Sequence, residues 1–250
     1  MTTSTVTRRF AAALLLLVPL AFTMCFTLLQ QLFDYPGILR EPTEDILRKF
    51  AAGGAPLLAV WYALTLTAIA FVPLAVLAHR AIAPRETPLL LWLATTFGVI
   101  AGVAQTLGFL RWPFLVPYLA QTYLDPAANE AQRAAAAIAF EAFHRYAGMA
   151  VGEHLGYLST SLWTLFLSVV LLRTAVAPRW LGVSGIVLAL GIACGLAEPF
   201  GWQLGGTINA FSYLVWAVWL MALGASVFAY HRWPWTAKSY AMAQPTPSNG

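Results

Sequence analysis

The sequence predicts an all-α membrane protein, a polytopic bundle of about six transmembrane helices with a surface helix in its outer loops. The composition is 60% hydrophobic and 10% charged, with a mean hydropathy of +0.72, whereas soluble domains carry about 25% charged residues. Six apolar stretches are separated by polar segments, and a helix needs about 20 apolar residues to cross a bilayer. No remaining loop is long enough to bury a core of its own, so we expect a single transmembrane domain over residues 1–235.

The predicted spans, in chain order, are residues 10–33, 55–77, 88–109, 148–172, 181–196 and 207–229. The first follows Arg8 and Arg9, as the apolar part of a secretory signal would. Its apolar run is longer than that of a secretory signal, however, and no A-x-A cleavage site follows, so we predict a retained helix. Residues 236–250 are rich in Pro, Ser and Thr and have no apolar periodicity, which predicts a disordered cytoplasmic tail.

Two of the connecting segments have structure of their own. Thr43 is predicted to cap a short surface helix that has acidic residues in its first turn and the pair Gly53-Gly54 after its end. Residues 112–124 are aromatic and contain two prolines, which indicates an interfacial or partly re-entrant stretch. Asp125 and Pro126 then predict the start of a further helix, and this helix can run directly into the fourth span.

The basic residues predict the orientation of the chain. If the N-terminus is cytoplasmic, the cytoplasmic segments contain a single acid, Glu86, and most of the bases: Arg8, Arg9, Arg80, Arg85, Arg173, Arg179, Arg232 and Lys238. The positive-inside rule therefore predicts that both termini are cytoplasmic. The arginine and alanine bias indicates a bacterium, so we expect a multi-pass protein of the inner membrane. Because the net charge of +4 comes from span ends and not from one basic patch, nucleic acid is excluded as a partner.

Glu153 and His154 are adjacent ionisable residues inside the fourth apolar span. A charge at bilayer depth is costly, so such residues mark functional sites by default. The other polar groups expected at a similar depth are Gln105, Arg111, Tyr157, Glu198 and Asn209. Together they predict a ligand-binding pocket that opens to the outer face, in which Glu153 is either held neutral or paired with a cation such as Arg111. The alternative is that these residues only hold neighbouring helices together.

Glycines of the fourth span predict close helix packing. Gly148, Gly152 and Gly156 recur every four residues and so lie in one stripe. Small residues in such a stripe let a neighbouring backbone approach, and Gly98 and Gly102 of the third span offer a complementary surface. Association between whole molecules, as a homo-oligomer or with another membrane protein, is the second interpretation of the stripe.

Other classes of function have weaker support. Glu141-x-x-His144 has the spacing of metal ligands in helical bundles, and with His154 these residues are candidates for a single divalent ion. A membrane-embedded enzyme that uses Glu153 or His154 is the alternative to a binding, transport or sensing protein, and a structural or regulatory partner protein is a third possibility. No cofactor is indicated. The only lysines, Lys49 and Lys238, lie outside the spans, which excludes a retinal Schiff base.

Two stretches of sequence carry a resemblance to a known family. They are GEHLGYLSTSLWTLFLS, residues 152–168, and PRWLG, residues 178–182. On these the chain resembles the small bacterial six-span integral membrane proteins that are grouped as a domain of unknown function. The resemblance implies a six-span fold, and it implies no substrate and no residue roles.

Overall fold

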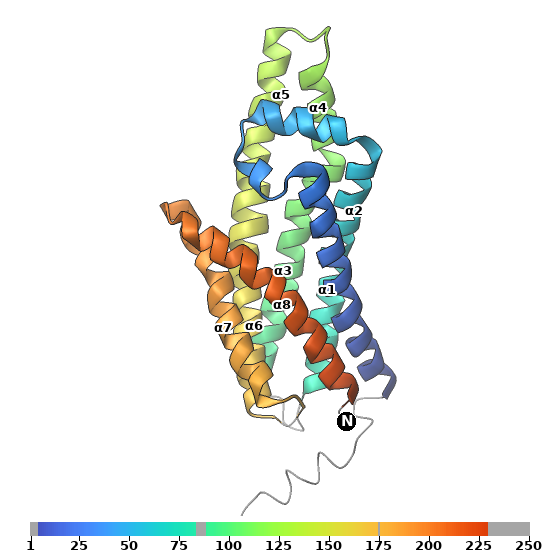
Figure 1. The fold of residues 1–250 in the computed structure, drawn as a ribbon, viewed down its shortest axis with the longest axis vertical. Coiled ribbons are helices and arrows are strands. Elements are labelled where there is room, and N and C mark those ends of the chain that lie inside the picture. The colour runs from blue at the N-terminus through green and yellow to red at the C-terminus, as the bar shows by residue number, and fades with distance from the viewer. Residues whose placement is uncertain (1–4, 84–88, 175, 230–250) are drawn as a thin grey trace, which may run out of the picture.

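The computed structural model describes residues 5–83, 89–174 and 176–229, and every regular element among them is a helix. Six of the helical stretches in this part of the chain are long and apolar enough to cross a membrane (Figure 1). The prediction of an all-α, six-span membrane protein is therefore confirmed. The predicted tail, residues 236–250, lies outside the described residues.

The elements in chain order are α1 (Thr5–Phe33), η1 (Gly37–Arg40), α2 (Thr43–Ile82), α3 (Leu89–Phe114), α4 (Val116–Leu124), α5 (Glu130–Phe143), η2 (His144–Leu155), α6 (Gly156–Leu172), α7 (Arg179–Ala193), η3 (Cys194–Phe200) and α8 (Gln203–Ala229). The short η1 and η3 are 3₁₀ helices, and η2 is a π-helix that joins α5 to α6. Helix contacts run from α1 to α2, α3, α6, α7, α8 and back to α1. The spans thus form a closed ring.

The two ends of this ring differ (Figure 1). We call the end at which α1 begins the terminal end, and the opposite end, beyond which α4 and α5 project, the hairpin end. The first part of α2 lies across the hairpin end, as the predicted surface helix should. Gly54 then interrupts α2 with a φ of 52°, a conformation that glycine adopts without a steric penalty. Thr43 does not cap this helix, because Pro42 is the capping residue and the Thr43 hydroxyl lies 3.4 Å from Oε2 of Glu141.

The segment 112–124, which was predicted to be interfacial or partly re-entrant, is helical. The Leu115 N–H donates to the Arg111 carbonyl at 2.9 Å, so α3 continues into α4 through a residue of helical conformation. Pro117 lies in the first turn of α4, where its missing N–H costs no hydrogen bond. As a result α4 and α5 form a helical hairpin that extends the third and fourth spans (Figure 1).

The start of α5 also differs from the prediction. Asn129 caps this helix, in place of Asp125 and Pro126, through a reciprocal pair of 2.9 Å hydrogen bonds with Gln132. Asp125 instead accepts from the N–H of Ala127 in the preceding turn at 2.8 Å. The expected continuation into the fourth span is observed, since α5, η2 and α6 form one helical stretch from Glu130 to Leu172.

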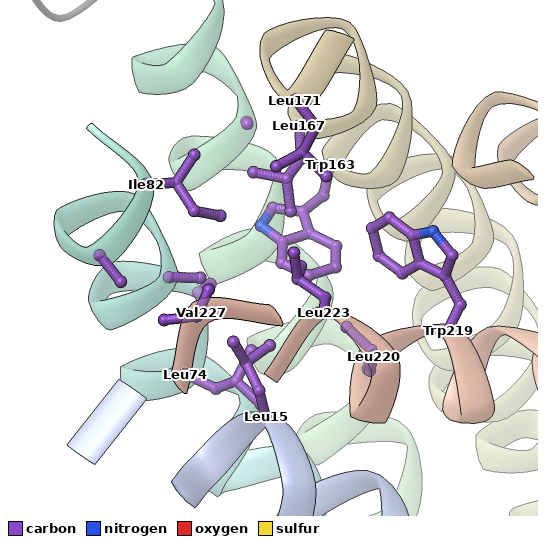
Figure 2. Packing of buried hydrophobic residues seen from close by; sticks show 14 of the residues in the cluster. Leu15, Leu74, Ile82, Trp163, Leu167, Leu171, Trp219, Leu220, Leu223 and Val227 are labelled. Carbon is purple, nitrogen blue, oxygen red and sulfur yellow. The ribbon is translucent and has the colours of Figure 1, made fainter. Parts of the chain in front are cut away.

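Two clusters of buried apolar side chains hold the ring together. The cluster nearer the terminal end contains Leu15, Leu74, Trp163 and Leu223, which Figure 2 shows in contact across several helices. The cluster nearer the hairpin end is aromatic, and its largest members are Phe33, Trp61, Trp112 and Phe140. Because lipid is as apolar as these side chains, helices in a membrane associate mainly through close van der Waals packing.

The glycine stripe packs against α3, as predicted, but at a residue that the pattern did not single out. A Cβ added to Gly108 would lie 2.7 Å from Cα of Gly152, so the two backbones touch. Gly102 faces Val72 of α2 instead, and Gly98 lies between Ala75 of α2 and Trp163 of α6. The close approach of α3 to η2 places the polar side chains of both elements in one region of the ring.

Candidate ligand-binding site

A cavity of about 100 Å³ lies inside the half of the ring nearer the hairpin end. We call it the aromatic cavity, because many of the side chains that line it are aromatic: Phe22, Phe26, Tyr35, Trp61, Phe109, Trp112, Tyr157 and Tyr213. Its polar side chains, apart from the tyrosines, are Gln105, Arg111, Glu153 and Asn209. Residues from α1, α2, α3, η2, α6 and α8 therefore contribute to a single wall.

A second hollow, of about 250 Å³, lies beside the aromatic cavity. We call it the vestibule. It is lined by Arg40, Met149, Glu153, His154, Tyr157, Gly195, Glu198, Pro199, Gly201 and Gln203. Glu153 and Tyr157 line both hollows, so these two side chains form the boundary between them.

Arg40 connects the acidic residues of the site. Its Nη2 lies 2.7 Å from Oε1 of Glu198 and 3.4 Å from Oε2 of Glu153. The side chain of Glu153 is 20% exposed and that of Arg40 is 43% exposed, so the pair lies at the edge of the solvent-accessible surface. The sequence left two alternatives for Glu153, a neutral carboxyl or a pair with a cation such as Arg111. Among the described residues, Glu153 forms its ion pair with Arg40.

The loop between α1 and α2 positions Arg40. Ile38 and Leu39 are buried in the aromatic cluster next to the hairpin end, and the ring Nε2–H of His144 donates to the Leu39 carbonyl at 3.0 Å. Burial by itself would lower the pKa of Arg40, but the negative charges of Glu153 and Glu198 outweigh it and raise the pKa. Arg40 is therefore a permanent cation that is fixed over the vestibule.

Arg111 is the most deeply buried cation of the site. Only 8% of the residue is exposed, its Nη1–H donates to the carbonyl of Gly108, and its Cζ lies 5.1 Å from the ring centroid of Trp112. A Cβ on Gly148 would lie 2.5 Å from Nη2, so the bare glycine leaves room for the guanidinium. The buried Nε–H has no hydrogen-bond partner among the described residues.

Two of the expected site residues are engaged in contacts between helices. The amide of Gln105 on α3 donates to the hydroxyl of Thr160 on α6 at 3.2 Å. The amide of Asn209 on α8 donates to the Ile192 carbonyl on α7 at 2.6 Å. Both side chains line the aromatic cavity, but their nitrogen atoms already have protein partners.

The remaining expected residues are divided between the two hollows. His154 and Glu198 line only the vestibule, whereas Tyr157 lines both hollows. The candidate metal ligands do not come together, since Glu141 pairs with Arg145 at 2.7 Å and His144 binds the Leu39 carbonyl. The described ranges contain no group of three or more His, Cys, Asp or Glu residues that could hold a metal ion.

The structure adds Arg40, Tyr35 and Tyr213 to the residues that sequence reasoning selected. Arg40 carried a signal, because it is the single base in the acid-rich segment 34–45. Tyr35 lies two residues after the end of α1 and stands edge-on to Trp61, with ring centroids 5.3 Å apart. Burial, reinforced by the charge of Glu153, raises the pKa of Tyr35 far above its ordinary value, so its hydroxyl stays neutral.

A closed ring of six apolar helices that contains buried polar side chains defines an integral, multi-pass membrane protein. Residues 10–224 match the family model described as Domain of unknown function (DUF4386), and the chain belongs to that family. The resemblance seen in residues 152–168 and 178–182 is thereby confirmed. The comparisons with curated proteins and with solved structures found no match.

Proposed function

We propose that this protein binds a small molecule within the membrane, as a transporter component or as a sensor. The observation that carries the proposal is the meeting of two hollows at Glu153 and Tyr157. Buried ionisable residues that face a cavity in a membrane protein mark ligand or ion pathways. The vestibule is the entrance in this account, and the aromatic cavity is the binding site.

The distribution of charge supports an entrance on the non-cytoplasmic side. Arg8, Arg80, Arg173 and Arg179 all lie at or near span ends of the terminal end. By the positive-inside rule, these bases support a terminal end that faces the cytoplasm of a bacterial cell. The vestibule, in the half of the ring that carries the hairpin, then opens to the outside.

The contacts of Arg40 support control of this entrance. Arg40 belongs to the loop between α1 and α2, Glu153 belongs to η2, and Glu198 belongs to η3. A ligand that moves Glu153 must change its contact with Arg40 and so disturb the loop. Occupancy of the aromatic cavity is in this way coupled to a surface element, which both a sensor and a gated transporter need.

A structural role is the second candidate, and it is favoured for Gln105 and Asn209. Their amides join α3 to α6 and α8 to α7, as interhelical hydrogen bonds in membranes commonly do. Glu153 and Arg111 differ from them, because they are charged and their hydrogen bonds do not join two spans: Glu153 contacts Arg40 of η1, and Arg111 binds the Gly108 carbonyl of its own helix. Removal of a structural residue lowers stability, whereas removal of a binding residue abolishes a ligand effect.

A thermal-shift screen of the purified protein tests the proposal. Amino acids, sugars, organic acids and organic amines are added as separate classes, and we expect at least one class to raise the unfolding temperature in proportion to occupancy. The shift should disappear in Glu153→Gln and persist in Glu130→Gln, which alters an exposed acid in the first turn of α5. A screen without any shift, or a shift that survives in Glu153→Gln, Arg40→Gln and Arg111→Gln alike, contradicts the proposal.

A further inference from the structure

We infer that the aromatic cavity takes a small organic anion, a carboxylate with a short apolar or aromatic body, and that the carboxylate binds Arg111. The inference rests on the proposed function and names the class of ligand. Its basis is a buried guanidinium with unused donors, a cavity that this guanidinium lines, and the size and apolar character of the remaining wall.

Arg111 has hydrogen-bond donors that none of the described residues uses. A guanidinium carries five N–H donors, and the structure gives one of them a partner, the Gly108 carbonyl. The Nε–H is buried without a partner among the described residues. A buried charge is costly unless it is paired and hydrogen-bonded. Arg111 therefore has donors available for a hydrogen-bond acceptor that the described residues do not supply.

The second step concerns the missing counter-ion. No carboxylate within the described part of the chain lies within 4.0 Å of Arg111, although Glu153 lines the same cavity. Glu153 is engaged with Arg40 at 3.4 Å. Glu198 contacts Arg40 at 2.7 Å as well, so both acids of the site pair with Arg40, and Arg111 has no acid as a direct partner. A carboxylate ligand would supply that partner, because carboxylates bind guanidinium groups through two parallel hydrogen bonds.

The third step concerns the body of the ligand. Trp61 and Trp112 are stacked with ring centroids 4.5 Å apart, and Phe22, Phe26 and Phe109 complete an apolar wall. The cavity of about 100 Å³ is somewhat smaller than an engineered apolar cavity of about 150 Å³ that binds benzene. It therefore suits a single small ring or a short alkyl chain, and its mostly apolar wall has few partners for the many hydroxyl groups of a sugar.

Titration calorimetry with sodium benzoate, sodium butyrate, benzyl alcohol and benzylamine tests this inference on the full-length protein. We expect both carboxylates to bind and the neutral and cationic probes to bind at least tenfold more weakly. Arg111→Gln should weaken benzoate binding at least tenfold, and Arg111→Lys should retain part of it. Arg145→Gln, which changes an exposed arginine on η2, is the matched control and should bind as the wild type does.

A second variant covers the case in which Arg111→Gln fails to fold. Gly148→Ala places a methyl group where Nη2 lies, so it should displace the guanidinium and weaken benzoate binding while Arg111 is still present. Equal binding of benzoate and benzyl alcohol, or no binding of either carboxylate, overturns the inference. If amines or sugars raise the unfolding temperature and this effect depends on Glu153, the proposed function holds and the inference of a carboxylate ligand is wrong. If no class of compound binds, the proposed function and the inference are both wrong.

Discussion

Arg40 donates to Oε1 of Glu198 at 2.7 Å, across 158 residues of sequence. The contact joins the loop after α1 to η3, and the same guanidinium reaches Glu153 at 3.4 Å. One cation thus holds three separate segments around the vestibule. The proposed entrance to the aromatic cavity depends on this bridge and on the vestibule that Arg40 lines.

Arg40→Gln should lower the stability of the protein by roughly 1–2 kcal/mol. Hydrogen bonds to charged groups contribute about 1.5–3 kcal/mol, and the exposure of Arg40 reduces that contribution. The unfolding temperature in detergent measures the effect. Arg48→Gln is the matched control, because Arg48 pairs with Glu44 on an exposed helix face, and it should leave the unfolding temperature unchanged. An equal response of the two variants would show that the Arg40 bridge adds nothing.

Gly152→Ala should destabilise the contact of η2 with α3. The added Cβ would lie 3.0 Å from Cα of Gly108, so the two elements must separate, and overpacking of this kind costs about 1–3 kcal/mol. Gly37→Ala is the control, since nothing lies within 4 Å of its Cβ position. Thermal unfolding of both variants checks the prediction, and wild-type stability of Gly152→Ala would argue against the close approach.

Stability should fall as the pH rises above about 10. Burial raises the pKa of Tyr35 above its ordinary value, so the folded protein keeps a proton that the unfolded chain releases. The stability that this proton provides is complete below the unfolded-state pKa and is lost as the pH increases beyond it. Tyr35→Phe should therefore reduce the alkaline loss measured by thermal unfolding. Tyr118→Phe, at an exposed site, should leave the loss as it is in the wild type.

Cysteine labelling tests the proposed orientation. In a background with Cys25 and Cys194 replaced by serine, Ala128→Cys lies between α4 and α5 at the hairpin end, and Ala83→Cys follows α2 at the terminal end. A membrane-impermeant maleimide applied to intact bacterial cells should label the first and spare the second. The reverse pattern would place the vestibule in the cytoplasm.

The six spans could be predicted because each needs only a long apolar run, and Glu153 and His154 could be singled out because ionisable residues are rare in such runs. The ends of the helices were harder to predict from the sequence. Asn129 caps α5, where Asp125 was predicted to do so, because Asn129 and Gln132 exchange two hydrogen bonds. Asn and Asp are both common helix caps, so residue type alone does not show which of them begins the helix. The third span is longer than predicted and continues past residue 109, because Trp112 packs into the aromatic cluster. The prolines near Trp112 had indicated a break in the helix at this point.

The polar residues selected from the sequence line the two hollows, but their contact partners could not be predicted. Glu153 and Arg111 do line one cavity, but the ion pair of Glu153 is formed by Arg40. That choice depends on the path of a loop, which is held by buried Ile38 and Leu39 and by His144. The aromatic wall was also missed, because its residues come from several helices whose order around the ring is a property of the fold.

A crystal structure of the protein grown with benzoate would show whether Arg111 binds a carboxylate. We expect density for one ring in the aromatic cavity beside Trp112, with the carboxylate within hydrogen-bond distance of Arg111 and with Glu153 at the boundary to the vestibule. Water alone in that cavity at saturating benzoate, or benzoate bound only on the lipid-facing surface, would contradict it.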